Sequence, residues 1–286
     1  MSDGRARAVT MLVIGASVIG LAPILVRLSA AGPAATGLWR LVFALPFLAA
    51  PALREPGGLT GGSRFALLAG AAFAFDLACW HYGIVNTSVA KATVLANLTP
   101  IVVTAVAWAF FHQRPASLFL VAVALSVVGS AVMALSKSTG ITGPNPLLGD
   151  TLSTFTSGWY ALYFLAMSEA RRRHGTSHVM LWSSITGLPL LLVIAWSLGE
   201  RLLPATGAGW AACIALGVVH AGGQGSIAWA LGRLPPATAS VTVLVQPIVT
   251  TALGWLLFGE LLTPTQAAGA ALALAGVVLA QRSSRR

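Results

Sequence analysis

The sequence predicts an all-α integral membrane protein whose ten transmembrane helices form two inverted five-helix repeats. Composition is the first reason: 57% of the 286 residues are hydrophobic and only 8% are charged, whereas about 25% of the residues in a soluble domain are charged. The second reason is that the apolar stretches are about 20 residues long, enough to cross a hydrocarbon core about 30 Å thick. The third is an internal repeat, because residues 90–102 recur in similar form as residues 237–249.

The ten spans can be placed in order along the chain. The first apolar run has the length of a full span and lacks a small-residue cleavage pattern, so we expect it to be retained as a helix rather than removed as a signal peptide. The expected spans are residues 8–28, 34–53, 65–84, 88–111, 117–135, 149–167, 177–198, 209–231, 236–258 and 264–280.

The repeat extends through much of each half. The same register aligns Thr104 with Thr251, and then the pairs Ala105/Ala252, Trp108/Trp255, Phe111/Phe258 and Gly129/Gly276. A linker rich in Gly, Pro, Ser and Thr separates the copies, so we expect a first repeat over residues 1–147 and a second over residues 148–286. Five spans is an odd number, so the two repeats must cross the bilayer in opposite orientations, as in alternating-access carriers.

The net charge of +10 comes from 17 basic and 7 acidic residues. Arg27, Lys91, Lys137 and Arg201 fall on one side of the predicted membrane. Twelve basic residues fall on the other side: Arg5, Arg7, Arg54, Arg64, Arg114, Arg171, Arg172, Arg173, Arg233, Arg282, Arg285 and Arg286. The positive-inside rule therefore places both termini in the cytoplasm and predicts a multi-pass protein of the cell inner membrane. This distribution accounts for the charge without nucleic acid as a partner.

Cysteine usage excludes a disulfide framework. Cys79 and Cys213 both fall within predicted spans, so we expect free thiols that pack as small apolar groups. Two cysteines also cannot supply a four-cysteine metal site. We expect no metal and no cofactor.

Four segments resemble the drug/metabolite transporter superfamily, specifically its EamA-domain type. They are Asn97-Leu98-Thr99-Pro100, Trp108 to Phe111, Gln246-Pro247-Ile248 and Trp255 to Glu260. The first repeat departs from the family pattern at Phe111-His112-Gln113-Arg114, where an acidic residue is common. The resemblance implies two five-helix halves around a central cavity and export of amino acids or other small metabolites. Within the superfamily the chain is similar to aromatic amino-acid exporters of the YddG type.

Two ionisable side chains lie at membrane depth, where a charge costs about 2.5–3.5 kcal/mol and normally faces a cavity or a partner. Asp76 lies slightly past the middle of the third span, and Arg40 lies about two turns into the second span. One interpretation is a structural salt bridge between them. The other is that Asp76 binds a substrate ammonium group or a proton, with Arg40 in a structural or coupling role or snorkelling to the headgroups.

The repeat aligns one face of the third span with one face of the eighth. Phe73, Leu77 and His81 correspond to His220, Gln224 and Ala228, and each set is spaced by four residues on one helical face. Polar residues from both copies share this face, so His81, His220 and Gln224 are candidate cavity residues. A satisfied structural role is the alternative for each of them.

Equivalent prolines interrupt the fourth and ninth spans. Pro100 and Pro247 each remove a backbone donor and free the carbonyl four residues earlier, at Ala96 and Val243. Such carbonyls persist in lipid only where protein or a watery cavity satisfies them. These prolines are hinges at a cavity or simple packing kinks. Their polar neighbours Asn97 and Gln246 are candidates for orienting a ligand.

Aromatic residues away from the helix ends favour an apolar or aromatic zwitterion as the substrate, with core packing as the alternative. They are Trp80, Tyr82, Trp159, Tyr160 and Tyr163. Stripes of small residues occur in the fifth span (Ala122, Ser126, Ser130) and the tenth (Gly269, Ala273), and they favour close helix packing within the chain or in a weak homodimer.

These observations favour a transporter of a small-molecule substrate, an amino acid or related metabolite, with protons as candidate coupling ions and the lipid bilayer as its environment. A multidrug or cationic-compound carrier, anchored on Asp76, is the alternative. An intramembrane enzyme is a distant one, because Gly223-Gln224-Gly225-Ser226 has its serine one place too late for the Gly-x-Ser-x-Gly motif.

Overall fold

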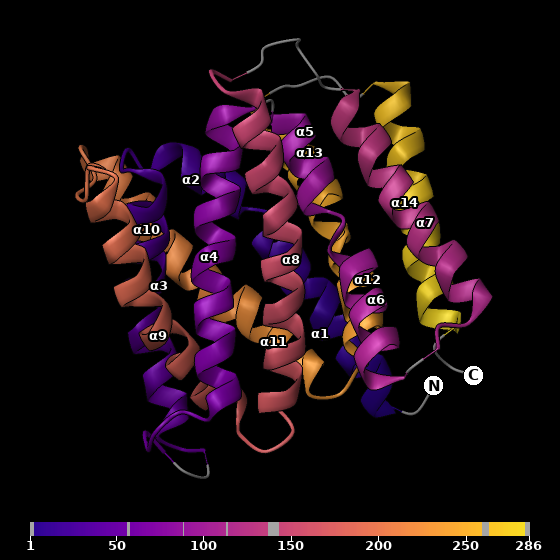
Figure 1. Cartoon of the computed structure of the whole chain (residues 1–286), viewed down its shortest axis with the longest axis horizontal. Helices are drawn as coiled ribbons and strands as arrows, with labels where there is room; N and C mark the ends of the chain where they lie inside the picture. The colour runs from indigo at the N-terminus through magenta and orange to yellow at the C-terminus, as the bar shows by residue number, and fades with distance from the viewer. Residues whose placement is uncertain are drawn as a thin grey trace.

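A computed structural model describes residues 3–55, 58–87, 89–112, 114–136, 143–258 and 263–283. Within these residues every regular element is a helix (Figure 1). The helices are α1 (Asp3–Ile19), α2 (Ala22–Leu28), α3 (Pro33–Ala52), α4 (Arg64–Asn86), α5 (Val89–Ala96), α6 (Thr99–Phe111), α7 (Ser117–Leu135), α8 (Pro146–Ala170), α9 (Thr176–Ser197), α10 (Gly207–Val219), the π-helix η1 (His220–Gln224), α11 (Gly225–Leu231), α12 (Pro236–Val243), α13 (Val245–Phe258) and α14 (Pro264–Ser283).

The predicted all-α membrane fold is confirmed. In the described part of the chain, nine helical segments are both long enough and apolar enough to cross a bilayer. The remaining predicted span, the sixth at residues 149–167, corresponds to α8, which has 25 residues but lacks the hydropathy of the other nine. Its polarity comes from the run of Ser and Thr residues between Thr151 and Ser157.

The helices run in alternating directions, and the corresponding helices of the two halves run in opposite directions. In Figure 1, α7 rises from the end at which both termini lie, and α14 descends to that end beside it. Likewise α5 and α13 both lie toward the end opposite the termini, and α6 contacts α12 toward the other end, so the fourth and ninth spans are antiparallel. The inverted arrangement expected from an odd number of spans per repeat is therefore present.

The fourth and ninth spans are broken at equivalent places, as the two prolines predict. α5 ends at Ala96 and α6 begins at Thr99, while α12 ends at Val243 and α13 begins at Val245. The Thr99 hydroxyl donates to the Ala96 carbonyl at 2.9 Å. This bond satisfies the carbonyl that Pro100 leaves without its helical partner. The break is thus built into the sequence of the first half.

The small-residue stripes pack against each other within the chain. A side chain added at Gly129 would collide with the backbone of α14, and one added at Gly276 would collide with Ser126. The Ser126 hydroxyl also donates to the Ala273 carbonyl at 3.4 Å. The two equivalent glycines therefore bring α7 and α14 into backbone contact, and this face is not available to a second copy of the chain.

Two further expectations concern individual residues. Cys79 and Cys213 are free thiols, as predicted. Several residues named in the sequence analysis lie outside the described residues: Gln113, Lys137, Gly259, Glu260, Arg285 and Arg286.

Candidate functional site

Polar and aromatic side chains from six helical elements meet in the middle of the helical bundle. We call this set the central cluster. Five of its charged or polar members are less than a tenth exposed: Arg40 at 3%, Asp76 at 7%, Ser184 at 1%, His220 at 2% and Gln224 at 1%. The members are Arg40 on α3, Phe73 and Asp76 on α4, Tyr160 and Tyr163 on α8, Ser184 on α9, His220 and Gln224 on η1, and Gln246 on α13.

Phe73 is the aromatic centre of this cluster. Its ring centroid lies 5.0 Å from that of Tyr163 and 5.2 Å from that of His220. The Arg40 guanidinium carbon lies 5.4 Å from the same centroid, within the range of a cation–π contact. Phe73 and His220 occupy equivalent positions in the two repeats, so the two halves touch here through corresponding residues.

The remaining polar members connect to this centre through weak or long contacts. Gln224 Nε2 donates to the Tyr160 hydroxyl at 3.5 Å, and the Tyr160 and Tyr163 rings are parallel with centroids 5.7 Å apart. The Gln246 side chain lies near the Tyr160 hydroxyl, but in the described residues its Nε2 makes no hydrogen bond of normal geometry. The Ser184 hydroxyl lies 3.4 Å from His220 Nε2. At these distances the hydrogen bonds are weak, so the polar groups are only loosely satisfied.

Arg40 and Asp76 are electrostatic neighbours, but they make no direct ion pair with each other. Among the described residues, no hydrogen bond joins Arg40 to Asp76. An ion pair is found there between Arg172 and Glu169, but it lies on the surface. The structural salt bridge that the sequence allowed is therefore absent from this conformation. Both side chains are buried. Apart from the contact of Arg40 with Phe73, no hydrogen bond or ion pair of either group is found among the described residues, although buried charges are normally paired.

Several buried nitrogen atoms of the cluster have no hydrogen-bond partner within the described part of the chain. They are Arg40 Nε, His220 Nδ1 and Gln246 Nε2. Arginine and amide nitrogens can only donate, and a histidine nitrogen can donate in one tautomer. Leaving a buried donor unpaired costs about 1–3 kcal/mol. The cluster therefore places unpaired donors beside the acceptor oxygens of Asp76, an arrangement that suits a ligand with both acceptor and donor groups.

The sequence analysis did not identify the π-helix that carries His220 and Gln224. Such single-turn widenings of an α-helix are frequent at functional sites. The local signal is the glycine pair within this turn. A side chain at Gly223 would lie 3.0 Å from Ile19 and Val18 of α1, so the glycine permits close approach of α1 at the point where the helix widens.

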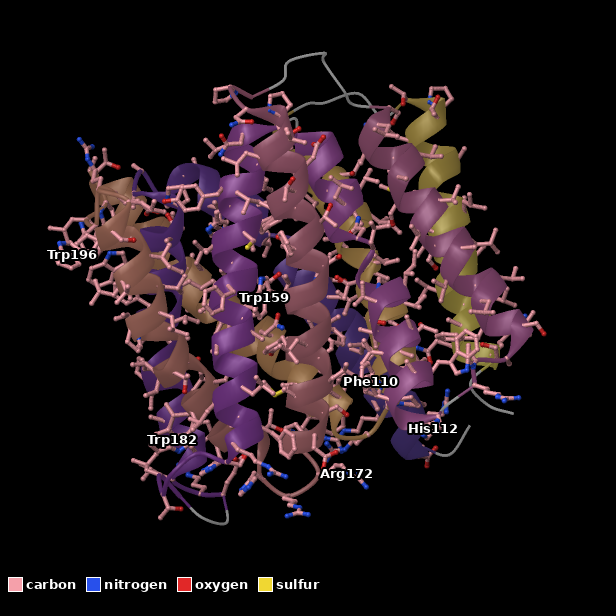
Figure 2. The ribbon with its side chains drawn as sticks, in the orientation of Figure 1. Phe110, His112, Trp159, Arg172, Trp182 and Trp196 are labelled. Atoms are coloured by element: carbon pink, nitrogen blue, oxygen red, sulfur yellow. The ribbon has the colours of Figure 1, made fainter. Side chains whose placement is uncertain are left out.

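Four of the predicted cavity residues lie away from the central cluster. His81 Nδ1 lies 2.7 Å from the Pro33 carbonyl, and the Trp80 ring lies beside the His81 ring. Tyr82 donates its hydroxyl to Glu200. These three residues lie near the end of α4 that is opposite the termini. Trp159, labelled in Figure 2, stacks on Phe75 with centroids 4.9 Å apart instead of joining Tyr160.

The two helix breaks hold the other predicted residues. Asn97 lies at the first break, and its Nδ2 is buried without a partner in the described residues. Pro100 is buried in the first turn of α6, and Pro247 is half-buried in the first turn of α13. Asn97, Pro100 and Pro247 are therefore grouped with the breaks, while Gln246 is the break residue that reaches the central cluster.

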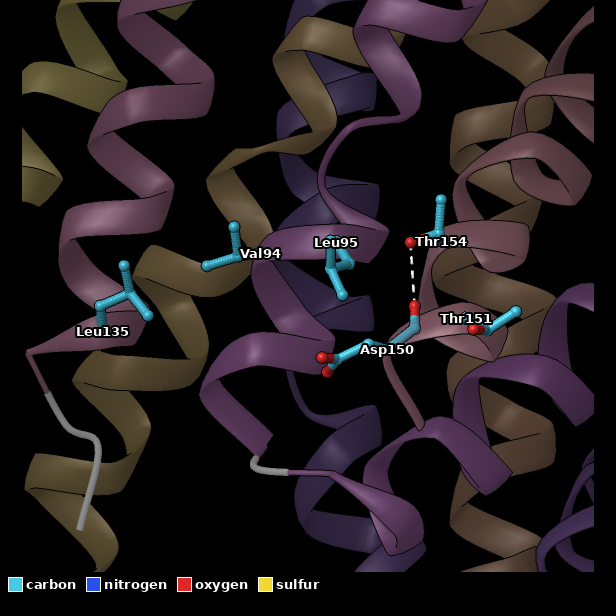
Figure 3. A pocket seen from close by; sticks show the side chains of 6 residues that line it. All are labelled: Val94, Leu95, Leu135, Asp150, Thr151 and Thr154. Carbon is cyan, nitrogen blue, oxygen red and sulfur yellow. Dashed lines mark hydrogen bonds between the residues drawn. The ribbon is translucent and has the colours of Figure 1, made fainter. Parts of the chain in front are cut away.

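A separate pocket of about 390 Å³ lies between α5, α7 and α8 (Figure 3). It lies where α7 ends and α8 begins, toward the end of the bundle opposite the termini (Figure 1). Its walls are mainly apolar, and Asp150 and Thr154 contribute polar atoms. The Thr154 hydroxyl donates to the Asp150 carbonyl at 2.9 Å, and the Asp150 carboxylate accepts from Thr87 at 2.8 Å. The polar groups that line this pocket are thus bonded within the protein, in contrast to those of the central cluster.

Comparison with known proteins places the chain in a transporter family. The model of the EamA-like transporter family matches residues 6–135 and again residues 147–281. The pseudopaline exporter CntI of Pseudomonas aeruginosa (strain UCBPP-PA14) is 22% identical over 225 residues, which cover 78% of this chain and 77% of that one. An uncharacterized transporter of Archaeoglobus fulgidus is 26% identical over 277 residues and covers 95% of both chains.

Two more matches agree with this placement. The uncharacterized transporter YwfM of Bacillus subtilis (strain 168) is 27% identical over 208 residues, covering 70% of this chain and 67% of that one. A crystal structure of a protein that is 16% identical covers 99% of both chains with a TM-score of 0.83, so the fold is shared. With two family matches that together span nearly the whole sequence, this multi-pass membrane protein belongs to the EamA-like transporter family.

Proposed function

We propose that this protein exports small neutral or aromatic amino acids across the inner membrane by alternating access, with the central cluster as the substrate site between the halves 1–147 and 148–286. The observation that carries the proposal is the pair Arg40 and Asp76. These opposite charges are buried as neighbours and make no direct ion pair with each other in the described residues.

A zwitterion satisfies both charges at once. Its carboxylate supplies the acceptors for Arg40 Nε, Gln246 Nε2 and a protonated His220 Nδ1, which are unpaired in the described part of the chain. Its ammonium group is the counter-ion for Asp76. A charge-assisted bond of either kind is roughly twice as strong as a neutral hydrogen bond, so both ends of the amino acid contribute to recognition.

The aromatic rings beside these charges favour an apolar or aromatic side chain on the substrate. Phe73, Tyr160 and Tyr163 offer ring faces and edges that pack on a phenyl or indole group. A sugar phosphate would need several arginines at the site, whereas the cluster contains one arginine, Arg40, among the described residues. The relative in Pseudomonas is named as an exporter of pseudopaline, which supports outward movement of a small metabolite.

The orientation follows from charge. The arginine-rich turn that holds Arg172 lies at the end of the bundle where both termini lie (Figures 1 and 2). The positive-inside rule assigns that end to the cytoplasm. Because α7 and α14 use their small-residue faces within the chain, we propose a monomer as the transporting unit. Asp76 and His220 are the buried titratable groups that we propose for proton coupling.

The test is transport by the purified protein in proteoliposomes. Uptake of labelled phenylalanine, threonine and a lipophilic cation is measured with and without an imposed pH gradient, and empty liposomes serve as the control. Saturable phenylalanine flux is the expected result, and its response to the gradient reports proton coupling. Cation flux without amino-acid flux would refute the proposal and support the multidrug alternative, in which Asp76 alone anchors the substrate.

A further inference from the structure

Helices α3 and α9 are corresponding helices of the two repeats, and each carries the same three marker residues. Gly32, Trp39 and Pro46 correspond at one constant spacing to Gly175, Trp182 and Pro189. Both helices remain continuous through their prolines, α3 over 20 residues and α9 over 22. They lie antiparallel, so the start of each helix is near the end of the other.

A carboxylate caps the start of α3. Glu200, which follows α9, accepts from the backbone nitrogen atoms of Ala34 at 3.0 Å and Ala35 at 2.9 Å. The Tyr82 hydroxyl of α4 donates to the same carboxylate, and Trp39 Nε1 donates to the Leu202 carbonyl at 2.7 Å. We call this group of bonds the outer clasp. Its bonds join the first repeat to the second over sequence separations of 118 to 166 residues.

An equivalent group of bonds caps the start of α9 at the opposite end. Glu55, which follows α3, accepts from the backbone nitrogen atoms of Ser177 at 3.0 Å and His178 at 2.8 Å. Trp182 Nε1 donates to the Thr60 carbonyl at 3.0 Å. We call this group the inner clasp. Figure 2 labels Trp182 near this end of α9 and Trp196 near the other.

Glycines make both clasps sterically possible. A Cβ atom at Gly32 would collide with the Glu200 carboxylate, and one at Gly175 would collide with the Glu55 carboxylate. A second equivalent pair lies on the neighbouring helices, where Gly70 of α4 contacts the Ser183 backbone and Gly217 of α10 contacts Phe43. The close contacts therefore follow the same inverted symmetry as the clasps.

The physical strength of each clasp comes from three sources that act together. The backbone donors in the first turn of a helix have no partner within the helix. The positive end of the helix dipole favours a carboxylate, and hydrogen bonds to an ionised acceptor are the stronger kind. Both clasps are closed in the same conformation, so α3 and α9 are held together at both membrane ends at once.

We propose that Glu55 and Glu200 are matched positioning residues that fix α3 and α9 as one rigid frame, against which the broken fourth and ninth spans move during transport. The frame carries Arg40 from the first repeat and Ser184, the neighbour of His220, from the second. It therefore holds two sides of the central cluster at constant separation. This inference rests on the proposed transport function.

The first test locks the frame covalently. In a chain without Cys79 and Cys213, Gly37 and Leu191 are replaced by cysteine, because a Cβ at Gly37 would lie 3.4 Å from the Leu191 side chain. The two thiols are joined by oxidation or by a short bifunctional thiosulfonate, and mass spectrometry measures the yield. A rigid frame predicts that the rate of phenylalanine transport changes less than twofold. A tenfold loss that reduction reverses would overturn the proposal, because α3 and α9 would then have to separate.

The second test needs no substrate. Glu55→Gln and Glu200→Gln each weaken one clasp, and Glu169→Gln, which removes a surface carboxylate paired with Arg172, is the matched control. We expect each clasp variant to lower the Tm in detergent by about 2–4 °C and the control to leave it unchanged. Unchanged Tm values in both clasp variants would overturn the proposal. If the wild type moved no amino acid, the proposed function would fail while this result stayed readable.

Discussion

Glutamate and aspartate serve opposite purposes at the ends and in the middle of this molecule. The Glu200 carboxylate accepts hydrogen bonds from Ala34, Ala35 and Tyr82, whereas no hydrogen bond to Asp76 is found within the described residues. Asp76 is buried and Glu200 is partly buried. The difference is that the protein supplies hydrogen-bond partners for Glu200, whereas Asp76 has none in the described part of the chain, as its proposed role in binding an ammonium group or a proton requires.

The same contrast holds for the nitrogen donors. The indoles of Trp39 and Trp182 both donate to carbonyl groups at the clasps. In the central cluster, by contrast, Arg40 Nε and Gln246 Nε2 are buried without acceptors among the residues that the structure describes. A fully bonded polar group stabilises the fold, and an unpaired one reduces stability until something binds. Variants at the two places should therefore separate stability from transport.

The largest effect is expected from Asp76→Asn. Removing the counter-ion of the substrate ammonium should lower kcat/KM for phenylalanine roughly 30-fold, a loss of about 2 kcal/mol, whereas in a carrier of cations the same change should abolish transport. The Tm should not fall, because the substitution removes an unpaired buried charge. Transport assays and thermal unfolding in detergent check this pair of outcomes. If Asp76→Asn lowered the Tm as much as Glu200→Gln does, Asp76 would stabilise the fold as the outer clasp does, and the contrast between the two places would be wrong.

Arg40→Gln is expected to have the next largest effect. Loss of the guanidinium should raise the KM for phenylalanine about tenfold, equivalent to about 1.4 kcal/mol. Transport or binding of phenylethylamine, which has no carboxylate, should be unaffected. Competition of unlabelled phenylethylamine against labelled phenylalanine in both proteins provides the measurement. Equal losses for the two compounds would mean that Arg40 supports the fold of the site and does not contact the carboxylate.

A smaller effect is expected from Tyr160→Phe. This change removes a hydroxyl that Gln224 contacts at 3.5 Å but keeps the ring that stacks on Tyr163. The loss of one weak hydrogen bond predicts a decrease of about fivefold in kcat/KM, or about 1 kcal/mol. Tyr82→Phe is the matched control at the outer clasp, and it should lower the Tm while changing transport less. A loss of Tm in Tyr160→Phe and a loss of transport in Tyr82→Phe would contradict these assignments.

The smallest effect concerns His174, which lies beyond α8 near the inner clasp. Partial burial, followed by the nearby His178 and Arg173, lowers the pKa of His174 below its ordinary value. The unfolded chain therefore binds this proton more readily, so stability is complete above about pH 6.5 and declines as the pH falls. His174→Gln should reduce the loss of Tm between pH 8 and pH 5. If the Tm of His174→Gln depended on pH as that of the wild type does, the loss at low pH would come from other groups.

Local signals in the sequence were enough to predict much of the fold. The apolar runs predict the span positions, and Pro100 and Pro247 predict where the fourth and ninth spans break. The alignment of Phe73 with His220 identifies two equivalent positions that are in contact. Each of these inferences needs only helical periodicity, proline chemistry or the repeat.

The parts that the sequence did not predict depend on distant partners. In the sequence, nothing distinguishes Glu55 and Glu200 from other loop residues. Their roles arise only when α3 and α9 pack, because each carboxylate then reaches the first turn of a helix in the other repeat. The hydrogen bonds that turn Tyr82 toward Glu200 and His81 toward the Pro33 carbonyl form in the same region, at the start of α3. The π-helix depends on the approach of α1 to Gly223. None of these contacts leaves a periodic pattern in the chain.

Ligand binding to the purified wild type tests the central claim most directly, because it asks whether both charges of the substrate are recognised at one site. Calorimetry would compare L-phenylalanine with 3-phenylpropionate, which lacks the ammonium group, and with phenylethylamine, which lacks the carboxylate. We expect phenylalanine to bind at least tenfold more tightly than either analogue. Binding of phenylethylamine as tight as that of phenylalanine would contradict this expectation and would identify a carrier of cations.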